Sequence, residues 1–525
     1  MISLEQFTKK RAFRTAMFVL VLAAGAFMRL YALGQVPRGI NSDEAMSAYQ
    51  AYTLLTSGID LNGYHNPVYF VAWGGGMNAL EIYLMIPFIR LLGLTELAIR
   101  LPQAILGVIS LPVFFLLLRR LFDETTAWIG FFLLAISPWH IMLSRWALES
   151  NLAPAFLLFG LYFLSVALDR RPAFLLLSGA FFGLSLYSYA ITWMVVPLML
   201  ALLMAYALFT RTFQLSLYSI AAVVALFLLA LPLLLFVAVN QGWLPEIRNA
   251  VFSVPLMPQW RSNVLTTQGL VSLQSFYRLF DLLVTQSDGY LYNSFPQFGL
   301  YYLFSLPLAL YGAVCSLKSV FSALRRRSFS AEALIHIQLL AGLLVCLLID
   351  TVNVNRSNFI YLPVIALCAY GVRQLLLLPR KAVFQTVVAA YAVSFLAFAG
   401  FYFGDGRKEL ADHYRPGTRE AIAYANELTD DTVICRVENG YIKVLYNLAY
   451  PVEEYRDTVV YKDPPYPNPA SFGKFVFEDP GETETDGTVY IAQDEEAQAF
   501  LDAGFTVDTF NRMIVAIRPE SGGGN

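Results

Sequence analysis

Charged side chains are scarce in this sequence: Asp, Glu, Lys and Arg make up 14% of its 525 residues, while 57% of the residues are hydrophobic. A soluble globular domain typically carries about 25% charged residues. The low charge therefore excludes an ordinary soluble protein and indicates an integral membrane protein. The formal net charge of −2 also leaves no broad basic surface, so we expect no nucleic-acid partner.

Cysteine and histidine are rare as well, with four residues of each. Cys315, Cys346 and Cys368 fall inside apolar runs, and Cys435 stands alone in the polar C-terminal part. This pattern contains neither a disulfide framework nor the ligand spacing of a metal site. A glycine-rich phosphate loop and internal repeats are also missing. We therefore expect no obligatory metal or other cofactor.

Long apolar runs are abundant instead. A helix that crosses about 30 Å of hydrocarbon needs about 20 mostly apolar residues, because its backbone polar groups must be satisfied within the segment. About eleven segments meet this requirement: residues 15–34, 99–118, 125–142, 151–168, 172–190, 192–209, 214–238, 298–316, 332–350, 357–377 and 383–403.

Basic residues recur at alternate connections between these segments, as the positive-inside rule predicts for a multi-pass protein of the cell membrane. The predicted cytoplasmic clusters are the N-terminal Lys9, Lys10, Arg11 and Arg14, then Arg119–Arg120, Arg170–Arg171, Arg211, Lys318 with Arg325–Arg327, and Arg380–Lys381. The N-terminus is then cytoplasmic, and an odd number of spans places the C-terminus on the outer side. The first apolar run is too long for a signal-peptide core and is predicted to remain as a membrane anchor.

Two long outer loops follow from this topology, at residues 35–98 and 240–297. Residues 78–92 in the first loop are apolar but short, and a span there would break the alternation of basic connections. We therefore predict an interfacial or re-entrant helix at residues 78–92. The second loop mixes tryptophan and charged residues with apolar ones, which favours amphipathic helices on the membrane surface.

The composition changes abruptly after Gly404. Residues 405–525 are polar and acidic, and helix-like stretches such as GTREAIAYANEL alternate with strand-like ones such as TVYIAQ. We predict a small extracytoplasmic α/β domain at residues 405–525, with a long loop at residues 456–486. Residues 1–404 would form the transmembrane catalytic module.

Ionisable residues near the predicted outer ends of the spans are candidates for a functional site, because charge at membrane depth is costly. These candidates are Asp43 and Glu44 in PRGINSDEAM, the further acids Glu81 and Glu149, and the basic residues Arg29, His65, Arg145 and Arg356. Arginine binds phosphate oxygens bidentately, and a carboxylate can take a proton from an attacking hydroxyl or amine. These residue types fit the transfer of a sugar from a polyprenyl phosphate, in which direct displacement inverts the anomeric carbon.

Five stretches between residues 15 and 200 carry a recognisable pattern: RLYALG followed by SDEAMSAYQAY, then LLGLTELAIRLPQAILGV, RRLFDETTAWIG and LSRWALESNLAPAF. In these stretches the chain resembles bacterial membrane glycosyltransferases related to the protein O-mannosyltransferases and to the aminoarabinose transferase of lipid A. The resemblance implies the GT-C fold, a bundle of membrane helices with the active site in outer loops. It also implies a polyprenyl-monophosphate sugar donor and a lipid, glycan or protein acceptor.

The resemblance implies roles for individual residues. Asp43 matches the essential first-loop acid of the family, and Glu44 matches the second acid of the mannosyltransferase pair. Glu149 resembles an acid in the corresponding outer loop, with Arg145 beside it. Asp43 is therefore the predicted base or acceptor-positioning acid, supported by Glu44.

One stretch departs from the family. The aminoarabinose transferases have a Glu-Lys-Pro-Pro-like stretch before the interfacial helix, whereas this chain reads GGGMNALE. No lysine is available there for the donor phosphate, so Arg356, Arg29 or Arg145 is predicted to bind it. Glu81 and His65 complete the predicted substrate-binding residues.

Several candidates also have a purely structural explanation. The SDE stretch is an ordinary helix N-terminal signal. Arg29 can extend to the membrane interface, and Arg145 with Glu149, four residues apart, can form an ion pair within one helix. A divalent cation held by Asp43 and Glu44 with the donor phosphate is a further alternative that we do not favour.

Other functional classes also stay open at this point. A transporter or flippase of lipid-linked sugars would need basic residues near a phosphate too, but it predicts a polar path through the spans and symmetric halves, which are not evident. A sensor or scaffold with an outer α/β domain would tolerate the loss of every acid named above. Within the enzymes, an oligosaccharide ligase or polymerase that uses a diphosphate donor is the alternative.

Overall fold

The computed structural model describes residues 11–169, 171–259, 273–349, 351–379, 381–463, 466–480 and 487–519. Lys9, Lys10, Arg170 and Arg380 of the predicted cytoplasmic clusters lie outside these ranges. The chain divides into two compact units. Unit 1 comprises Met1–Tyr31, Gln103–Leu231 and Ser262–Phe403, and unit 2 comprises Ala32–Pro102, Pro232–Arg261 and Gly404–Asn525.

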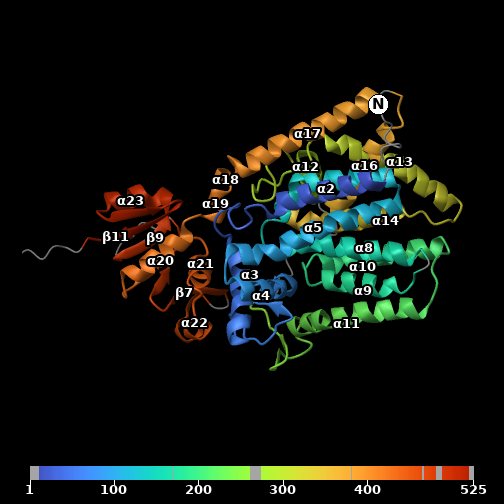
Figure 1. Ribbon diagram of the computed structural model, residues 1–525. Helices are drawn as coiled ribbons and strands as arrows, with labels where there is room; N and C mark the ends of the chain where they lie inside the picture. The colour runs from blue at the N-terminus through green and yellow to red at the C-terminus, as the bar shows by residue number, and fades with distance from the viewer. Residues whose placement is uncertain are drawn as a thin grey trace, which may run out of the picture. The chain divides into compact units, whose positions relative to one another are not determined.

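Apolar helices that lie side by side make up most of unit 1 (Figure 1). Eight helices among the described residues are long and apolar enough to cross a membrane: Ala12–Leu30 within α2 (Arg11–Leu30), α5 (Glu96–Leu121), Glu149–Ala167, α10 (Thr192–Phe209), α11 (Leu217–Asn240), α13 (Ser305–Arg325), Val354–Leu375 and α17 (Lys381–Phe403). Three shorter apolar helices are α6 (Glu124–Ile136), α9 (Phe174–Ser185) and α14 (Ala333–Leu347). A helix therefore occupies every predicted span, and the chain is a polytopic helical membrane protein. The number of spans stays a prediction.

Short helical elements interrupt or connect the long helices of unit 1. They are α7 (Pro138–Leu143), η1 (Glu149–Leu152) followed by α8 (Ala153–Ala167), α12 (Leu273–Thr285), and α15 (Val354–Ser357), η3 (Asn358–Ile360) and α16 (Tyr361–Leu375) in succession. In α12, Leu279 and Leu282 are buried, whereas the polar Gln274 and Asp281 are exposed. The second predicted outer loop thus contains an amphipathic helix, as expected.

The first part of unit 2 contains two helices and two small hairpins. These are α3 (Ser42–Ser57), α4 (Ala79–Leu92), β1 (Tyr69–Phe70) with β2 (Met77–Asn78), and β3 (Ile247–Arg248) with β4 (Ser253–Val254). The predicted helix at residues 78–92 is present as α4, which packs against α3. It is not among the eight helices long enough to cross a membrane.

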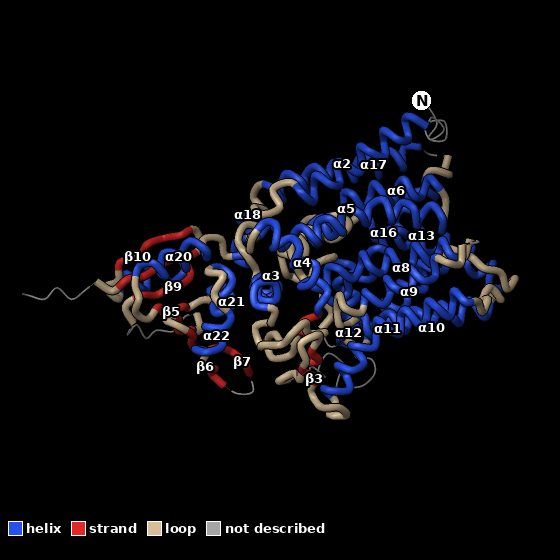
Figure 2. Tube along the Cα trace, turned by 60° about the horizontal axis from the view of Figure 1, so that its bottom comes forward, coloured by secondary structure: helices blue, strands red, loops and turns tan. Residues whose placement is uncertain are grey.

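The C-terminal part of unit 2 contains a seven-stranded sheet in the order β10-β11-β9-β5-β8-β7-β6. The strands are β5 (Val433–Cys435), β6 (Val460–Asp463), β7 (Tyr466–Phe472), β8 (Phe475–Phe477), β9 (Val489–Gln493), β10 (Thr506–Phe510) and β11 (Met513–Ile517). The helices are α18 (Gly406–Glu409), α19 (Ala411–Tyr414), α20 (Thr418–Leu428), α21 (Gly440–Asn447), α22 (Val452–Thr458), η4 (Asp494–Glu496) and α23 (Ala497–Asp502). Figure 2 shows the strands gathered beside α20. The predicted α and β elements are therefore present, while the outer location of this part stays a prediction.

Two details differ from the sequence-based expectations. The predicted loop at residues 456–486 is wrong for much of its length, because it contains β6, β7 and β8. The periodicity of the sequence does not indicate these strands for two reasons. Prolines lie within β7, and the register between β6 and β7 is irregular, with Pro469 opposite Tyr461. The unit boundary after Phe403 agrees with the composition change at Gly404, but the outer-loop residues 32–102 and 232–261 belong to the same unit as the C-terminal part.

Candidate active site

The PRGINSDEAM stretch forms the N-terminal end of α3 in unit 2. Asn41 is the N-cap: its Oδ1 accepts a hydrogen bond from the Asp43 N–H at 2.9 Å, and the Glu44 carboxylate accepts one from the Asn41 N–H at 3.2 Å. This is a capping box, which satisfies two otherwise unpaired backbone donors. Asp43 is half-buried in the first helical turn. The predicted helix signal is confirmed, and Asp43 is held where the helix dipole favours a negative charge.

Glu44 and Arg100 form an ion pair in which both side chains are 0% exposed. The Arg100 Nε donates to Glu44 Oε1 and its Nη2 to Oε2, each at 2.7 Å. The remaining N–H groups of Arg100 donate to the carbonyls of Leu33, Pro37 and Gly39, at 3.4, 2.7 and 2.8 Å. All five N–H donors of the guanidinium are thus used. The Arg100 side chain therefore fixes both the start of α3 and the loop before it.

Arg100 is a residue that the sequence argument missed as part of the site. It lies in the RLP stretch of α5, as the fifth residue of the helix. An arginine within a membrane-spanning apolar run was the signal that could have identified it, because such a charge normally has a specific partner. Its partner, Glu44, is 56 residues away in the chain.

Residues near the C-terminal part also hold this end of α3. The Ile40 N–H donates to the Tyr414 carbonyl at 2.8 Å, and the Arg100 guanidinium lies over the Tyr414 ring at 5.5 Å. Further along α3, the Tyr49 hydroxyl donates to the Tyr450 carbonyl at 2.7 Å. The backbone before Asp43 is therefore fixed by α5 and by the C-terminal part of unit 2.

The structure brings Glu81, but not His65, beside the first turns of α3. Ser47 lies one turn after Asp43 on the same helix face, and its hydroxyl donates to Glu81 Oε2 at 3.2 Å. Glu81 is buried in the first turn of α4. His65 is exposed, and its Nδ1 lies 2.9 Å from the carbonyl of Gly58, the C-cap of α3. It therefore lies near the opposite end of a helix that is on the order of 20 Å long.

Arg145 is fully buried in unit 1. Its Nε donates to the Tyr402 hydroxyl at 3.2 Å, and its Nη1 and Nη2 donate to the carbonyls of Met28 and Tyr31 at 3.0 and 2.9 Å. The chain leaves the helical conformation after Arg145, and Glu149 begins the separate helix η1. The alternative of an ion pair within one helix is therefore wrong, because no continuous helix joins the two residues.

Glu149 and Arg356 come from two loops of unit 1 that contact each other. The Asn358 side chain donates to the Ser150 carbonyl at 3.4 Å and to Asn151 Oδ1 at 3.2 Å, and α15 packs against η1. Arg356 is half-exposed on α15. The structure thus places a predicted acid and a predicted phosphate-binding arginine in neighbouring segments.

Arg29 is also fully buried in unit 1. Its Nε and Nη2 contact Nδ1 of His140 at 3.3 and 2.7 Å. Its other donors reach the carbonyls of Gly25, Ala135 and Leu134 at 2.8, 3.2 and 3.0 Å. The protein itself therefore uses all five N–H groups of Arg29, and we leave this residue out of the proposed phosphate-binding set.

Within the described part of the chain, no group of three or more His, Cys, Asp or Glu side chains is arranged to hold a metal ion. Asp43 and Glu44 are two acids, and the oxygens of Glu44 are engaged by Arg100 and Asn41. The absence of an obligatory divalent cation stays a prediction.

Comparisons with known proteins extend this description. A family model described as dolichyl-phosphate-mannose-protein mannosyltransferase matches residues 80–236. The crystal structure of ArnT from Cupriavidus metallidurans is similar in its apo state, with a TM-score of 0.59 and 15% identity over 96% of this chain and 98% of that chain. The same protein bound to undecaprenyl phosphate gives a TM-score of 0.60 and 15% identity over 97% and 99%. The chain has the GT-C fold.

The GT-C fold and the family match together indicate a membrane glycosyltransferase, as the sequence predicted. The match to residues 80–236 includes Arg100, Arg145 and Glu149 but does not reach Asp43. The archaeal oligosaccharyltransferase AglB from Archaeoglobus fulgidus is less similar, with a TM-score of 0.49 and 16% identity over 82% of this chain and 63% of that chain. A comparison with curated proteins finds no match.

Proposed function

We propose that the chain is an inverting glycosyltransferase that moves a sugar from a polyprenyl monophosphate to a lipid, glycan or protein acceptor on the outer side of the membrane. The start of α3 is the observation that carries this proposal. There Asp43 stands on a turn that is held by a capping box and by the buried Glu44–Arg100 pair. Catalytic groups must be held within about 0.5 Å of their productive position, and this arrangement supports such a role.

Asp43 is the proposed base. As the acceptor oxygen or nitrogen attacks the anomeric carbon, its proton passes to the Asp43 carboxylate, and the bond to the phosphate oxygen breaks. The products are the glycosylated acceptor, with inverted configuration, and the polyprenyl phosphate. The structure of ArnT bound to undecaprenyl phosphate supports a lipid of this class as the carrier.

Glu44 receives a different role from the one that the family resemblance implies. Both of its carboxylate oxygens accept hydrogen bonds from Arg100, and Oε2 also accepts one from the Asn41 N–H. We therefore assign Glu44 as a positioning residue for Asp43 rather than as an acid that exchanges protons with substrate. Glu81 and Glu149 stay candidates for the sugar and acceptor subsites.

Arg356 and Arg145 are the proposed ligands of the donor phosphate. Arg356 is the stronger candidate because it is half-exposed, whereas Arg145 is fully buried, and the Nη1 of Arg356 donates to the Thr351 carbonyl at 2.9 Å. A charge-assisted hydrogen bond contributes about 1.5–3 kcal/mol, so Arg356→Ala would raise the KM for the donor by about tenfold or more.

The test uses the purified full-length protein in liposomes with a panel of polyprenyl-phosphate-linked sugars and a membrane extract as the source of acceptor. Labelled sugar is followed into product for the unaltered protein, for Asp43→Asn, and for Glu420→Gln, which changes an exposed acid on α20. We expect transfer by the unaltered and Glu420→Gln proteins only. Full transfer by folded Asp43→Asn would refute the assigned role.

The same liposomes separate the competing functions. A transporter or flippase would carry the labelled lipid-linked sugar to the opposite leaflet and form no product. A ligase or polymerase would form product only from donors linked through a diphosphate. Either result, without transfer from any monophosphate donor, would replace the proposed reaction.

A further inference from the structure

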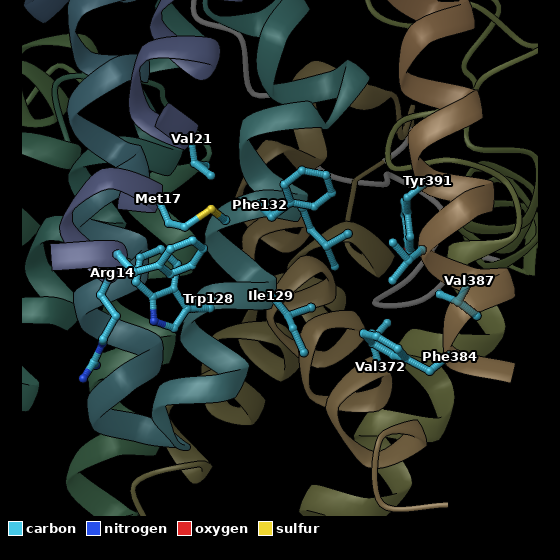
Figure 3. A pocket seen from close by; sticks show the side chains of 13 residues that line it. Arg14, Met17, Val21, Trp128, Ile129, Phe132, Val372, Phe384, Val387 and Tyr391 are labelled. Carbon is cyan, nitrogen blue, oxygen red and sulfur yellow. The ribbon is translucent and has the colours of Figure 1, made fainter. Parts of the chain in front are cut away.

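An apolar groove of about 300 Å³ lies between α2 and α17 in unit 1 (Figure 3). Met17 and Val21 of α2 line one wall, and Phe384 and Tyr391 of α17 line the other. Residues of α6 and α16, such as Phe132, complete the lining. Arg14 is the one charged residue among the described residues that line the groove.

The two helices that form the walls are both long and apolar enough to cross a membrane, and few of their residues are buried in the protein. The groove-lining residues of α17, which include Phe384, Val388 and Tyr391, recur at spacings of three and four, so they share one helix face. An apolar groove beside such helices is surrounded by hydrocarbon rather than water. The chemistry that fits it is therefore a lipid chain.

The depth of the groove narrows the choice of lipid. Its lining begins near the N-terminal ends of both helices and extends from Phe13 to Val21 on α2 and from Phe384 to Tyr391 on α17. At 1.5 Å per residue, these stretches are about 10–12 Å long. Half of a bilayer's hydrocarbon is about 15 Å thick. The groove thus covers one leaflet, on the side where α2 begins, as an acyl chain of a phospholipid does.

The charges at the end of the groove near the starts of α2 and α17 indicate which kind of lipid headgroup fits there. Arg14 is ion-paired with Glu124, and Arg373 pairs with Asp123 at 2.8 Å. These charges cancel. Lys381, the first residue of α17 and one turn before Phe384, is exposed and makes no ion pair within the part of the chain that the structure describes. Lys381 therefore places an uncompensated positive charge at the start of α17, which complements an anionic headgroup.

We propose that this groove is a binding site for an anionic phospholipid, with one acyl chain between α2 and α17 and the headgroup beside Arg14 and Lys381. The lipid fills space between two helices that otherwise contact each other little. The site is independent of the proposed transferase reaction, because it involves none of the residues assigned to that reaction.

The experiment is native mass spectrometry of the full-length protein in mild detergent, after incubation with phosphatidylglycerol or with phosphatidylcholine of the same chains. We expect retained phosphatidylglycerol and a higher Tm with that lipid than with phosphatidylcholine. Val388→Trp fills the groove and should lower retention about tenfold. Val393→Trp, on an exposed position of the same helix outside the groove, should leave retention unchanged.

Three results would overturn the proposal. One is equal retention by Val388→Trp and Val393→Trp. Another is equal retention of the two phospholipids, which would remove the headgroup assignment. The last is retention of polyprenyl phosphate alone at this site. If Val388→Trp does not fold, phosphatidylglycerol with a photoreactive acyl chain is crosslinked to the unaltered protein, and crosslinks outside α2, α6, α16 and α17 would contradict the assignment.

Discussion

Glu44 and Arg100 meet through two parallel hydrogen bonds of 2.7 Å, with no exposed surface on either side chain. The desolvation of a buried ion pair offsets most of its Coulombic attraction, so such a pair is seldom retained for stability alone. Here the pair joins the second turn of α5 to the first turn of α3. We conclude that its main effect is to fix the geometry of the turn that carries Asp43.

Breaking this pair from one side should be costly. Glu44→Gln or Arg100→Leu leaves the other charge buried without its partner, which typically costs about 3–5 kcal/mol. We expect a marked fall in Tm for each variant, measured by tryptophan fluorescence in detergent. The double variant Glu44→Leu/Arg100→Leu should recover only part of the stability, because no lone charge remains but the backbone groups that Arg100 and Glu44 satisfied lose their partners, and it should not recover transfer.

Arg38→Gln is the matched control for that experiment. Arg38 and Glu420 are 3.9 Å apart, and their side chains are 61% and 55% exposed. An exposed pair of this kind contributes about 0–1 kcal/mol. A loss for Arg38→Gln as large as that for Arg100→Leu would show that burial does not set the strength of these pairs.

Asp43→Asn tests the proposed base without removing the helix cap, because Asn41 supplies the capping oxygen. The rate of sugar transfer should fall by about 10²- to 10⁴-fold, the usual contribution of a general base. The Tm should change little, and the KM for the donor should stay near that of the unaltered protein. A raised donor KM with an unchanged kcat would instead indicate a binding role.

Gly39→Ala tests how closely the loop before Asp43 packs. Gly39 has φ +92°, and a Cβ there would lie 2.1 Å from the Tyr414 carbonyl oxygen. Backbone atoms cannot move aside easily, so we expect a loss of both stability and transfer. Gly58→Ala is the control, since Gly58 also has positive φ, +71°, but no atom lies within 4 Å of its Cβ position. It should lose only the left-handed backbone cost of about 1–2 kcal/mol.

We expect the stability of the protein to depend on pH because of the buried carboxyl group of Asp60. Its Oδ1 accepts hydrogen bonds from the N–H groups of Asn62 and Tyr64 at 2.9 and 2.8 Å, while Oδ2 has no hydrogen-bond partner among the described residues. Burial raises the pKa of Asp60 from 3.8 to about 7, although the two backbone hydrogen bonds, Arg456 and Arg248 act in the opposite direction.

The sign of this dependence follows from proton binding. Between pH 3.8 and about 7 the folded protein holds the Asp60 proton while the unfolded chain has lost it, so the contribution of Asp60 to stability falls as pH rises through this window. Asp60→Asn cannot ionise, so it should be more stable than the unaltered protein at pH 8 and should gain less at pH 5. An identical difference at both pH values would contradict the raised pKa.

Local sequence patterns predicted much of the fold. The helices were predictable because a membrane-spanning segment satisfies its backbone polar groups within itself, which leaves a long apolar run as its signature. The strands β9 and β11 were predictable for a similar reason, since most of their residues are buried and apolar. The strands β6 to β8 were not, because the register between β6 and β7 is irregular and the prolines within β7 are typical of a loop.

In the candidate site, too, some features follow from the local sequence and others only from the tertiary structure. The sequence by itself determined that Asp43 stands at the start of a helix, since the capping box of Asn41 and Glu44 involves residues three apart. Only the tertiary structure decided that Glu44 is held by Arg100 and that the guanidinium of Arg29 is used up by His140 and backbone carbonyls. Capping is a local interaction that any short stretch records. The partner of a buried charge depends on which distant segments pack together, and no local pattern contains that information.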